Sequence, residues 1–256
     1  MTRMQYTLKK SLGQHFLKDE HICRKIYDAI IQENISQLLE IGPGAGALTK
    51  YLLQAEHIHF KAVELDDEKV HYLLHTYPSL KDKLIHSDFL KAPLPFEGEF
   101  MVAGNFPYNI SSQILFKVLE WKGHVPVLTG MFQKEVAMRI AARPGSKVYG
   151  ILSVLVQAFY EAFYLFDVPP SCFNPPPKVM SGVIKLNRRE SIPVMRSEKD
   201  FFILVKTAFN QRRKMLRNAT RQLFDDEILR KEIFDKRAEQ LTIDNFAALT
   251  FEMKNA

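Results

Sequence analysis

The sequence predicts an α/β protein with a doubly wound parallel sheet, followed by a small all-helical domain. Over the first two thirds of the 256 residues, short apolar runs alternate with segments of helical periodicity, the order that builds βαβ units. Beyond Asn187-Arg188-Arg189 the segments are helical and contain no clear strand. We therefore expect one domain over residues 1–188 and a second over residues 189–256.

Each element of the predicted sheet follows from its local pattern. A short apolar run bounded by turn residues indicates a strand, and apolar residues at helical spacing indicate a helix. The predicted strands are QLLEIG (37–42), HFKAVELD (59–66), LIHSDFL (84–90), EFMVAGN (99–105) and VPVLTGMFQ (125–133). The predicted helices are residues 20–32, ALTKYLLQA (47–55), DEKVHYLLHTY (67–77) and ISSQILFKVLEW (110–121). Ligands of such a sheet bind at the carboxyl ends of its strands.

Composition and charge limit the classes of function. Lys and Arg number 35 against 29 Asp and Glu, giving a net charge of +6 and a pI near 9.1, which suggests an anionic partner. No apolar run approaches the roughly 20 residues of a membrane span, and the first ten residues lack the apolar segment of a signal peptide. Cys23 and Cys172 belong to no metal-ligand cluster. We expect a cytoplasmic protein with no metal site and no membrane partner.

Three predicted strands end in residues suited to a nucleoside. Gly42, Gly44 and Gly46 form a G-x-G-x-G turn, which differs from the G-x-G-x-x-G of dinucleotide folds and favours a ligand without a pyrophosphate. Glu64, at the end of the second strand, is placed to accept the ribose hydroxyls. Asp88, at the end of the third, can accept the exocyclic amine of adenine. The alternative for both acids is a helix cap or a turn.

The fourth strand ends in Asn105-Phe106-Pro107-Tyr108, which suits chemistry at the exocyclic amine of a nucleobase. Two acceptors that hold the amine hydrogens localise the nitrogen lone pair, and the Asn105 side-chain oxygen and Phe106 carbonyl are such acceptors. Pro107 restricts Phe106 to an extended backbone and so directs that carbonyl. Tyr108 offers a face on which a base stacks. The alternative is an ordinary turn after a strand.

A basic segment between Lys206 and Arg221 predicts contact with RNA phosphates. It holds six basic residues and no acid: Lys206, Arg212, Arg213, Lys214, Arg217 and Arg221. Arg213, Arg217 and Arg221 are spaced by four and are expected to share a helical face. Binding that neutralises phosphates falls steeply with ionic strength. The alternative is a solvated basic face with no partner.

Motifs along nearly the whole chain resemble the ribosomal RNA adenine N6,N6-dimethyltransferases, and most closely the bacterial small-subunit branch linked to kasugamycin sensitivity. In order, they are KKSLGQHFL, LEIGPGAGALT, AVELD, SDFL, GNFPYNISS, MFQKEVAMRI, YGILSVLVQ, VPPSCFNPPPKVMSGVIKL and AFNQRRKMLRN. The resemblance implies a Rossmann-like class I methyltransferase domain that uses S-adenosyl-L-methionine. It also implies an RNA-docking role for the helical domain.

The resemblance also assigns residues. It places the cofactor contacts on His15, Leu17, Gly42, Glu64, Asp88 and Asn105. Two positions depart from common family residues, because His15 stands where bacterial relatives often have Asn and Phe106 stands where Leu or Ile is common. Phe173 resembles an aromatic near the target-base pocket, with a buried packing role as the alternative.

The activity implied is the addition of two methyl groups to N6 of each of two adjacent adenines near the 3′ end of small-subunit (16S) ribosomal RNA. The resemblance further implies a monomer that acts on an immature small subunit during ribosome biogenesis. Two alternatives stay open. One is an adenine methyltransferase of large-subunit RNA of the antibiotic-resistance type, and the other is a non-catalytic ribosome-assembly or transcription factor with the same fold.

Overall fold

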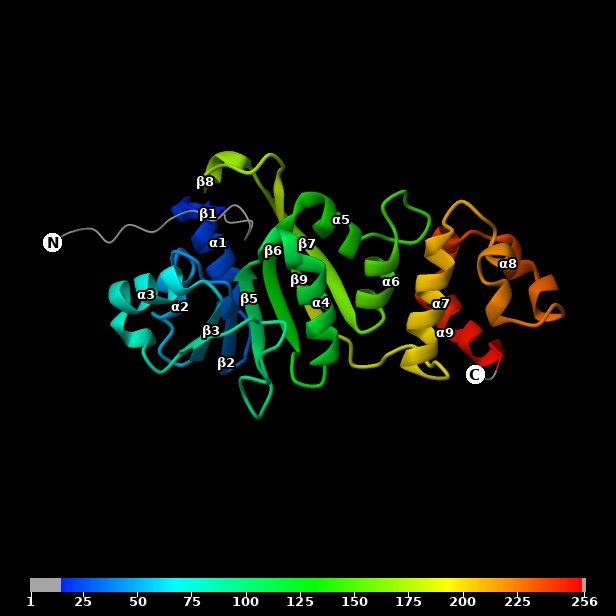
Figure 1. Cartoon of the computed structure of the whole chain (residues 1–256), viewed down its shortest axis with the longest axis horizontal. Coiled ribbons are helices and arrows are strands. Elements are labelled where there is room, and N and C mark those ends of the chain that lie inside the picture. Colours follow the sequence, from blue (N-terminus) through cyan, green and yellow to red (C-terminus); the bar gives the residue numbers. More distant parts are fainter. Residues whose placement is uncertain (1–14, 255–256) are drawn as a thin grey trace. The chain divides into compact units, whose positions relative to one another are not determined.

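The computed structural model describes residues 15–254. Its first feature is a seven-stranded mixed sheet (Figure 1). Its strand order is β4-β3-β2-β5-β6-β9-β7. The strands are Gln37–Ile41 (β2), His59–Glu64 (β3), Leu84–His86 (β4), Met101–Asn105 (β5), Val127–Gln133 (β6), Tyr160–Val168 (β7) and Ser181–Arg188 (β9). Strands β2 to β6 pair in parallel, as predicted, whereas β9 pairs antiparallel with β6. The order reverses between β2 and β5, and ligands bind at such a switch point.

Helices precede or follow most of the parallel strands. They are α1 (Glu20–Ile31), α2 (Thr49–Leu52), α3 (Asp67–Thr76) and α4 (Ser111–Glu120). Side-chain caps fix two of these starts, because Asp19 accepts a hydrogen bond from the backbone N–H of Ile22 and Asp66 accepts one from Glu68. The helix α2 is shorter than the nine residues predicted, since the chain after it closes tighter turns, with Ala55 N–H donating to the Leu52 carbonyl.

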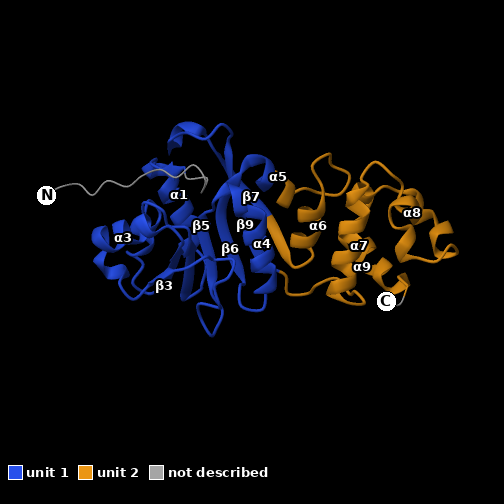
Figure 2. Cartoon of the chain, viewed as in Figure 1, with its two compact units in different colours: residues 1–137, 163–188 blue, residues 138–162, 189–256 orange. Residues whose placement is uncertain are grey.

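The chain divides into two compact units (Figure 2). Unit 1 comprises residues up to 137 together with 163–188, and unit 2 comprises 138–162 together with 189–256. This division differs from the one predicted in one segment, because residues 138–162 belong to the second unit. Tertiary packing sets this membership: helix α6 (Ile151–Gln157) packs on α7 (Glu198–Asn210).

Unit 1 makes room in its sheet for a buried aromatic ring. Gly104 of β5 and Gly130 of β6 are register partners. The side chain of Phe106 lies against both, and a Cβ at Gly130 would come within 2.1 Å of its ring. Phe106 is 1% exposed and packs on Phe132, with ring centroids 4.9 Å apart. The two glycines therefore hold the ring, and with it the backbone at residue 106, in one place.

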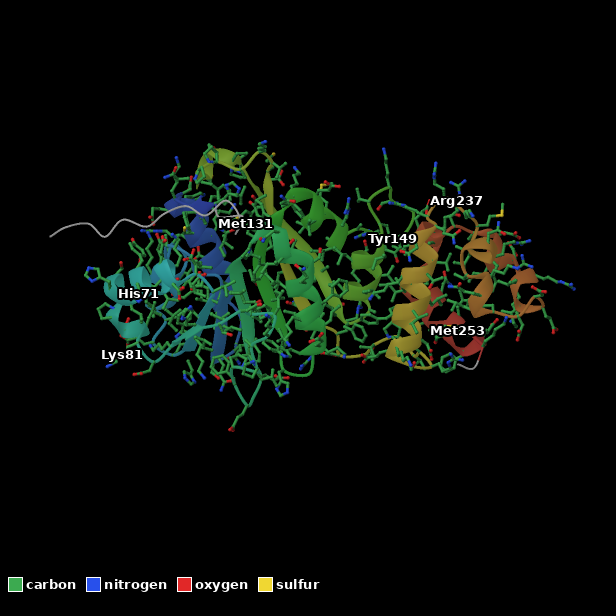
Figure 3. All side chains as sticks on the ribbon, viewed as in Figure 1. His71, Lys81, Met131, Tyr149, Arg237 and Met253 are labelled. Carbon is green, nitrogen blue, oxygen red and sulfur yellow. The ribbon has the colours of Figure 1, made fainter. Side chains whose placement is uncertain are left out.

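Unit 2 is mainly helical, in agreement with the predicted fold class. Besides α6 and α7 it contains α8 (Leu216–Ala219) and α9 (Ile243–Leu249), with short 3-10 turns between them. The buried ring of Tyr149, labelled in Figure 3, lies edge-on to Phe209, and Phe209 packs on Phe246. These aromatic contacts join residues from both segments of the unit.

Candidate functional site

A cavity of about 230 Å³ in unit 1 lies at the carboxyl ends of β2, β3, β4 and β5. The short strand β1 (Phe16–Leu17), which pairs antiparallel with β8 (Phe173–Asn174), contributes to its wall. The predicted site residues that line the cavity are His15, Leu17, Gly42, Gly44, Glu64, Asp88, Asn105, Phe106, Pro107 and Tyr108. Four separate strand ends thus converge on one site, as expected for a parallel sheet.

The glycine turn presents bare backbone to this cavity. Gly42, Gly44 and Gly46 have φ angles of 67°, 57° and 79°, a region that residues with a Cβ rarely adopt. A Cβ at Gly44 would lie 2.9 Å from a ring carbon of Phe16. Gly42 and Gly44 therefore line the cavity with backbone, and a side chain at Gly44 would displace the Phe16 ring.

Glu64 is held by backbone N–H groups. Its Oε2 accepts from Gly44 at 3.1 Å, and its Oε1 accepts from Leu65 at 2.9 Å and Asp66 at 3.0 Å. The capping role considered for Glu64 belongs to Asp66, which caps α3. The carboxylate of Glu64 is thereby fixed in orientation at the cavity wall.

Asp88 serves the local turn and also lines the cavity. Its Oδ1 accepts from the backbone N–H of Leu90 at 3.0 Å, and its Oδ2 lies 3.9 Å from the Nζ of Lys91. The side chain is about one-third exposed. Each of its oxygens accepts further hydrogen bonds, so the turn contact leaves acceptor capacity for a ligand.

The amide of Asn105 has a fixed orientation. Its Nδ2 donates to the backbone carbonyl of His15 at 3.2 Å, so Oδ1 is left as an acceptor. The ring of Phe106 is anchored in the core, and its backbone N–H donates to the Met131 carbonyl at 3.2 Å. With Pro107 in an extended conformation (φ −56°, ψ 126°), the two acceptor groups lie next to each other in the chain at the end of β5.

Tyr108 is fixed at its far end, because its hydroxyl shares a hydrogen bond of 2.5 Å with the buried Ser181. Burial raises the pKa of Tyr108, so the hydroxyl stays neutral. Its ring lies 5.7 Å from that of His15 at an angle of 31°. The His15 Nδ1 lies 2.9 Å from the Pro175 carbonyl, to which it donates, since a carbonyl oxygen only accepts.

Phe173, predicted to lie near the target-base pocket, is described in the structure by its packing. This side chain is 1% exposed, belongs to the hydrophobic core of unit 1 and does not line the cavity. Its backbone pairs with Leu17 across the β1–β8 ladder. Phe173 therefore has a packing role in unit 1, and its place near the target base stays a prediction.

Glu40 is a residue of the site that was not predicted from the sequence. It lies in β2, is 2% exposed and lines the cavity. The Oγ1 of Thr49 donates to its Oε2 at 2.7 Å. Burial, with the charge of Glu64 as a smaller contribution, raises the pKa of Glu40 to about 8. The sequence signal that could have identified Glu40 is the presence of an acid inside the apolar run QLLEI. A buried acid without a cationic partner marks a candidate functional group.

The basic segment of unit 2 differs from its predicted form. The helix α7 ends at Asn210 and α8 begins at Leu216, so Arg213, Arg217 and Arg221 do not lie on one continuous helix. Acids from elsewhere in the sequence pair with two of the segment's arginines. Arg217 forms an ion pair with Asp235.

Arg212 is also engaged within unit 2. It lies 3.8 Å from Glu239 and donates to the Lys147 carbonyl at 2.6 Å. Arg213, Lys214 and Arg221 have no ion pair among residues 15–254. The solvent-facing charge of the segment is therefore smaller than the sequence suggested.

The described part of the chain offers neither a metal cluster nor a membrane span. Between residues 15 and 254, no three His, Cys, Asp or Glu side chains are grouped so as to hold a metal ion. None of the helices in that range is long and apolar enough to cross a membrane. Cys23 and Cys172 are both free and buried.

Comparison with known proteins gives consistent matches over nearly the whole chain. Residues 5–253 match the family described as ribosomal RNA adenine dimethylase. The "Ribosomal RNA small subunit methyltransferase A" of Flavobacterium johnsoniae is 53% identical over 246 residues, covering 94% of both chains. The protein of the same name from Parabacteroides distasonis is 52% identical and covers 94% of this chain and 92% of its own.

Two solved structures share the fold. A dimethyladenosine transferase from Plasmodium falciparum superposes with a TM-score of 0.79 at 26% identity, covering 93% of this chain and 97% of its own. The 23S ribosomal RNA methyltransferase ErmE superposes with a TM-score of 0.73 at 21% identity, and the match covers 93% of this chain and 99% of ErmE. At that identity the second likeness concerns the fold alone.

Proposed function

The chain belongs to the ribosomal RNA adenine dimethylase family, and on this premise we propose its substrate and the roles of its residues. The enzyme is an S-adenosylmethionine-dependent adenine dimethyltransferase of ribosomal RNA. We propose that it adds two methyl groups to N6 of each of two adjacent adenines near the 3′ end of small-subunit RNA. The convergence of the Asn105 and Phe106 acceptors with Glu64 and Asp88 on one cavity carries the adenine N6 chemistry, and the names of relatives 53% and 52% identical support the small-subunit target.

The donor set of the cavity fits S-adenosylmethionine, which supplies an electrophilic methyl group when bound. Glu64 is placed to accept the ribose hydroxyls, because its carboxylate is already oriented by three backbone N–H groups. Asp88 is placed to accept the adenine amine. Gly42 and Gly44 line the cavity with backbone at positive φ, which lets the chain approach a ligand closely. His15 and Leu17 form the wall contributed by the N-terminal segment.

The chain activates the target amine by positioning it. In the first transfer, the Asn105 Oδ1 and the Phe106 carbonyl each accept one N6 hydrogen, which draws the lone pair of the nitrogen toward the methyl donor. In the second transfer one acceptor holds the single remaining hydrogen, and the N6 proton displaced by each methyl group passes to solvent. Both acceptors are fixed before substrate arrives, since Asn105 is bonded to His15 and the Phe106 ring is anchored between the glycines of β5 and β6. Prepositioned dipoles of this kind lower a barrier without reorganisation.

Tyr108 holds the plane of the base. Its hydroxyl is tied to Ser181, so the ring cannot rotate away, and stacking on such a ring contributes about 1–3 kcal/mol per base. We therefore assign Tyr108 the role of orienting the base through its ring.

We propose that the RNA phosphates contact the basic residues Arg213, Lys214 and Arg221. Arg212 and Arg217 contribute positive charge nearby while they stay paired with Glu239 and Asp235. Structured RNA is read by shape and by unstacked loop bases, which agrees with delivery of an adenine to Tyr108. We propose that the substrate is an immature small subunit in the cytoplasm, and that the enzyme acts as a monomer during its biogenesis.

Methyl transfer to defined RNA tests the substrate. The wild-type enzyme is incubated with labelled S-adenosylmethionine and either undermethylated small subunits or large-subunit RNA, and products are mapped by mass, with Asn105→Ala as the inactive control. Dimethyladenine at two adjacent positions near the small-subunit 3′ end is the expected result. Product in large-subunit RNA alone would support the antibiotic-resistance type of activity. Binding without any product would support the non-catalytic alternative.

A further inference from the structure

Glu40 is a buried acid whose surroundings do not balance a negative charge. It is 2% exposed at the cofactor cavity, two residues before Gly42. Its register partners on the neighbouring strands are Ala62 of β3 and Ala103 of β5, which offer no polar side chain. Its carboxyl group accepts a hydrogen bond from the neutral Thr49 hydroxyl.

The charged and titratable groups around Glu40 come from three elements. Glu64 of β3 carries the same sign and lines the same cavity. Tyr77, which follows α3, bears a hydroxyl whose pKa is raised chiefly by its own burial. Lys50 of α2, next to Thr49, is paired with Glu20 and does not neutralise Glu40.

The influences on the pKa of Glu40 are its burial, the Thr49 hydroxyl and the charge of Glu64, and none of them is a cation. Lys69 of α3 lies over the ring of Phe16, with its Nζ 5.1 Å from the ring centroid, and is not among the groups that shift this pKa. A carboxylate in this position is costly to ionise, because burial and a like charge both favour the neutral acid.

A cation in the cavity would reverse that balance. S-adenosylmethionine carries two positive groups, a sulfonium and an α-ammonium, and the cavity wall that Glu40 shares with Gly42 and Glu64 is where such a ligand lies under the proposed function. A buried carboxylate facing a cation is favoured over the acid by the same low dielectric that disfavours the isolated charge.

We propose that Glu40 exchanges a proton with solvent as the cationic methyl donor binds and leaves. In the empty cavity Glu40 is a neutral acid. On binding, its O–H bond breaks, the proton passes to solvent and the carboxylate faces the positive charge of the ligand. After methyl transfer the sulfonium charge is gone, so Glu40 regains a proton and the demethylated product is held less tightly. This inference rests on the cofactor assignment of the proposed function.

Calorimetry of cofactor binding to the full chain tests this proton exchange. S-adenosylmethionine is titrated at pH 7 in two buffers with different ionisation enthalpies, and the difference in heat counts the protons released. The wild type should release close to one proton, since an acid with a pKa of about 8 is about nine-tenths protonated at pH 7. Glu40→Gln should release about one proton fewer, whereas the exposed-acid control Glu56→Gln should match the wild type.

The demethylated product separates the two positive groups of the ligand. S-adenosylhomocysteine keeps the ammonium and lacks the sulfonium, so reduced release with it supports the exchange as proposed, and equal release overturns the sulfonium step. Thr49→Val provides a second variant. It removes a hydrogen bond that lowers the pKa of Glu40, so the pH at which release is half-maximal should move upward.

Failure of the proposed function and failure of the proton exchange give different results in this experiment. If the wild type does not bind S-adenosylmethionine, the proposed function falls and the proton exchange with it. If the wild type binds and its heats are the same in both buffers, or if Glu40→Gln releases as many protons as the wild type, only the role of Glu40 is refuted.

Discussion

The side-chain amide of Asn105 donates a hydrogen bond to the backbone carbonyl of His15, which lies 90 residues earlier in the chain. This bond joins the N-terminal wall of the cavity to the end of β5. Because the amide nitrogen is occupied, its oxygen is the group left to accept from a target amine. Cofactor wall and proposed catalytic acceptor are therefore positioned by one hydrogen bond.

Replacement of Asn105 separates these two roles. Asn105→Ala removes the acceptor and should reduce methyl transfer by at least about 100-fold, a typical effect of losing one prepositioned polar group, while RNA binding is largely retained. Asn105→Asp keeps an oxygen but places a carboxylate against the His15 carbonyl, so it should also weaken cofactor binding. Single-turnover transfer and cofactor affinity measure the two effects, and near-normal transfer by Asn105→Ala would contradict the catalytic role.

Two substitutions at Tyr108 separate ring from hydroxyl. Tyr108→Phe keeps the stacking face but leaves the buried Ser181 without its partner, which should lower the free energy of unfolding by about 1–3 kcal/mol with little loss of turnover. Tyr108→Ala removes the stacking face, and a loss of about 1–3 kcal/mol corresponds to roughly a 5- to 150-fold lower kcat/KM. Equal loss of turnover in both variants would show that the hydroxyl, and not the ring, carries the role.

Arg213 and Arg217 should respond differently to charge reversal. Arg213→Glu is expected to weaken RNA binding and to reduce the salt slope by about one for each phosphate that is no longer neutralised, with the thermal midpoint unchanged. Arg217→Glu faces Asp235 and should also lower the thermal midpoint. The exchange Arg217→Asp with Asp235→Arg restores the internal pair and serves as the control. An unchanged slope for Arg213→Glu would return this residue to a solvated surface role.

The cofactor-free protein should lose stability as the pH rises, because of Glu40. The pKa of Glu40 is about 8 in the folded protein, above its ordinary value of 4.5. Between these two pH values the folded state therefore keeps a proton that the unfolded chain has lost. Stability therefore falls as the pH rises through this window, by up to about 5 kcal/mol. Thermal midpoints from pH 5 to 8.5 should fall more steeply for the wild type than for Glu40→Gln. Parallel profiles would contradict this assignment.

Most of the residues that line the cavity could be predicted from the sequence, because only a few rules of sheet architecture determine where the cavity lies. Alternation of strands and helices implies a parallel sheet, and a parallel sheet brings its strand ends to one edge. Gly42, Glu64, Asp88 and Asn105 each lie at or near the carboxyl end of a predicted strand, so the pattern alone groups them. The structure brings all four to one cavity.

What escaped prediction depends on contacts between residues far apart in sequence. A short ladder pairs Phe173 with Leu17, and neither residue reveals this pairing locally. The acid that pairs with Arg217 lies 18 residues away in a separate turn. Helical spacing alone also missed the break after Asn210, because propensity does not report where the chain must reverse.

The glycine at position 130 restricts the order in which this site can change over generations. Any Cβ there would overlap the ring of Phe106, so a lineage that first acquires Gly130→Ala displaces the backbone at the proposed catalytic acceptor and is selected against. A lineage that first acquires Phe106→Leu keeps the carbonyl and loses only packing. Homologues with a larger residue at position 130 should therefore carry a smaller one at position 106, and the two positions should be inherited as a pair.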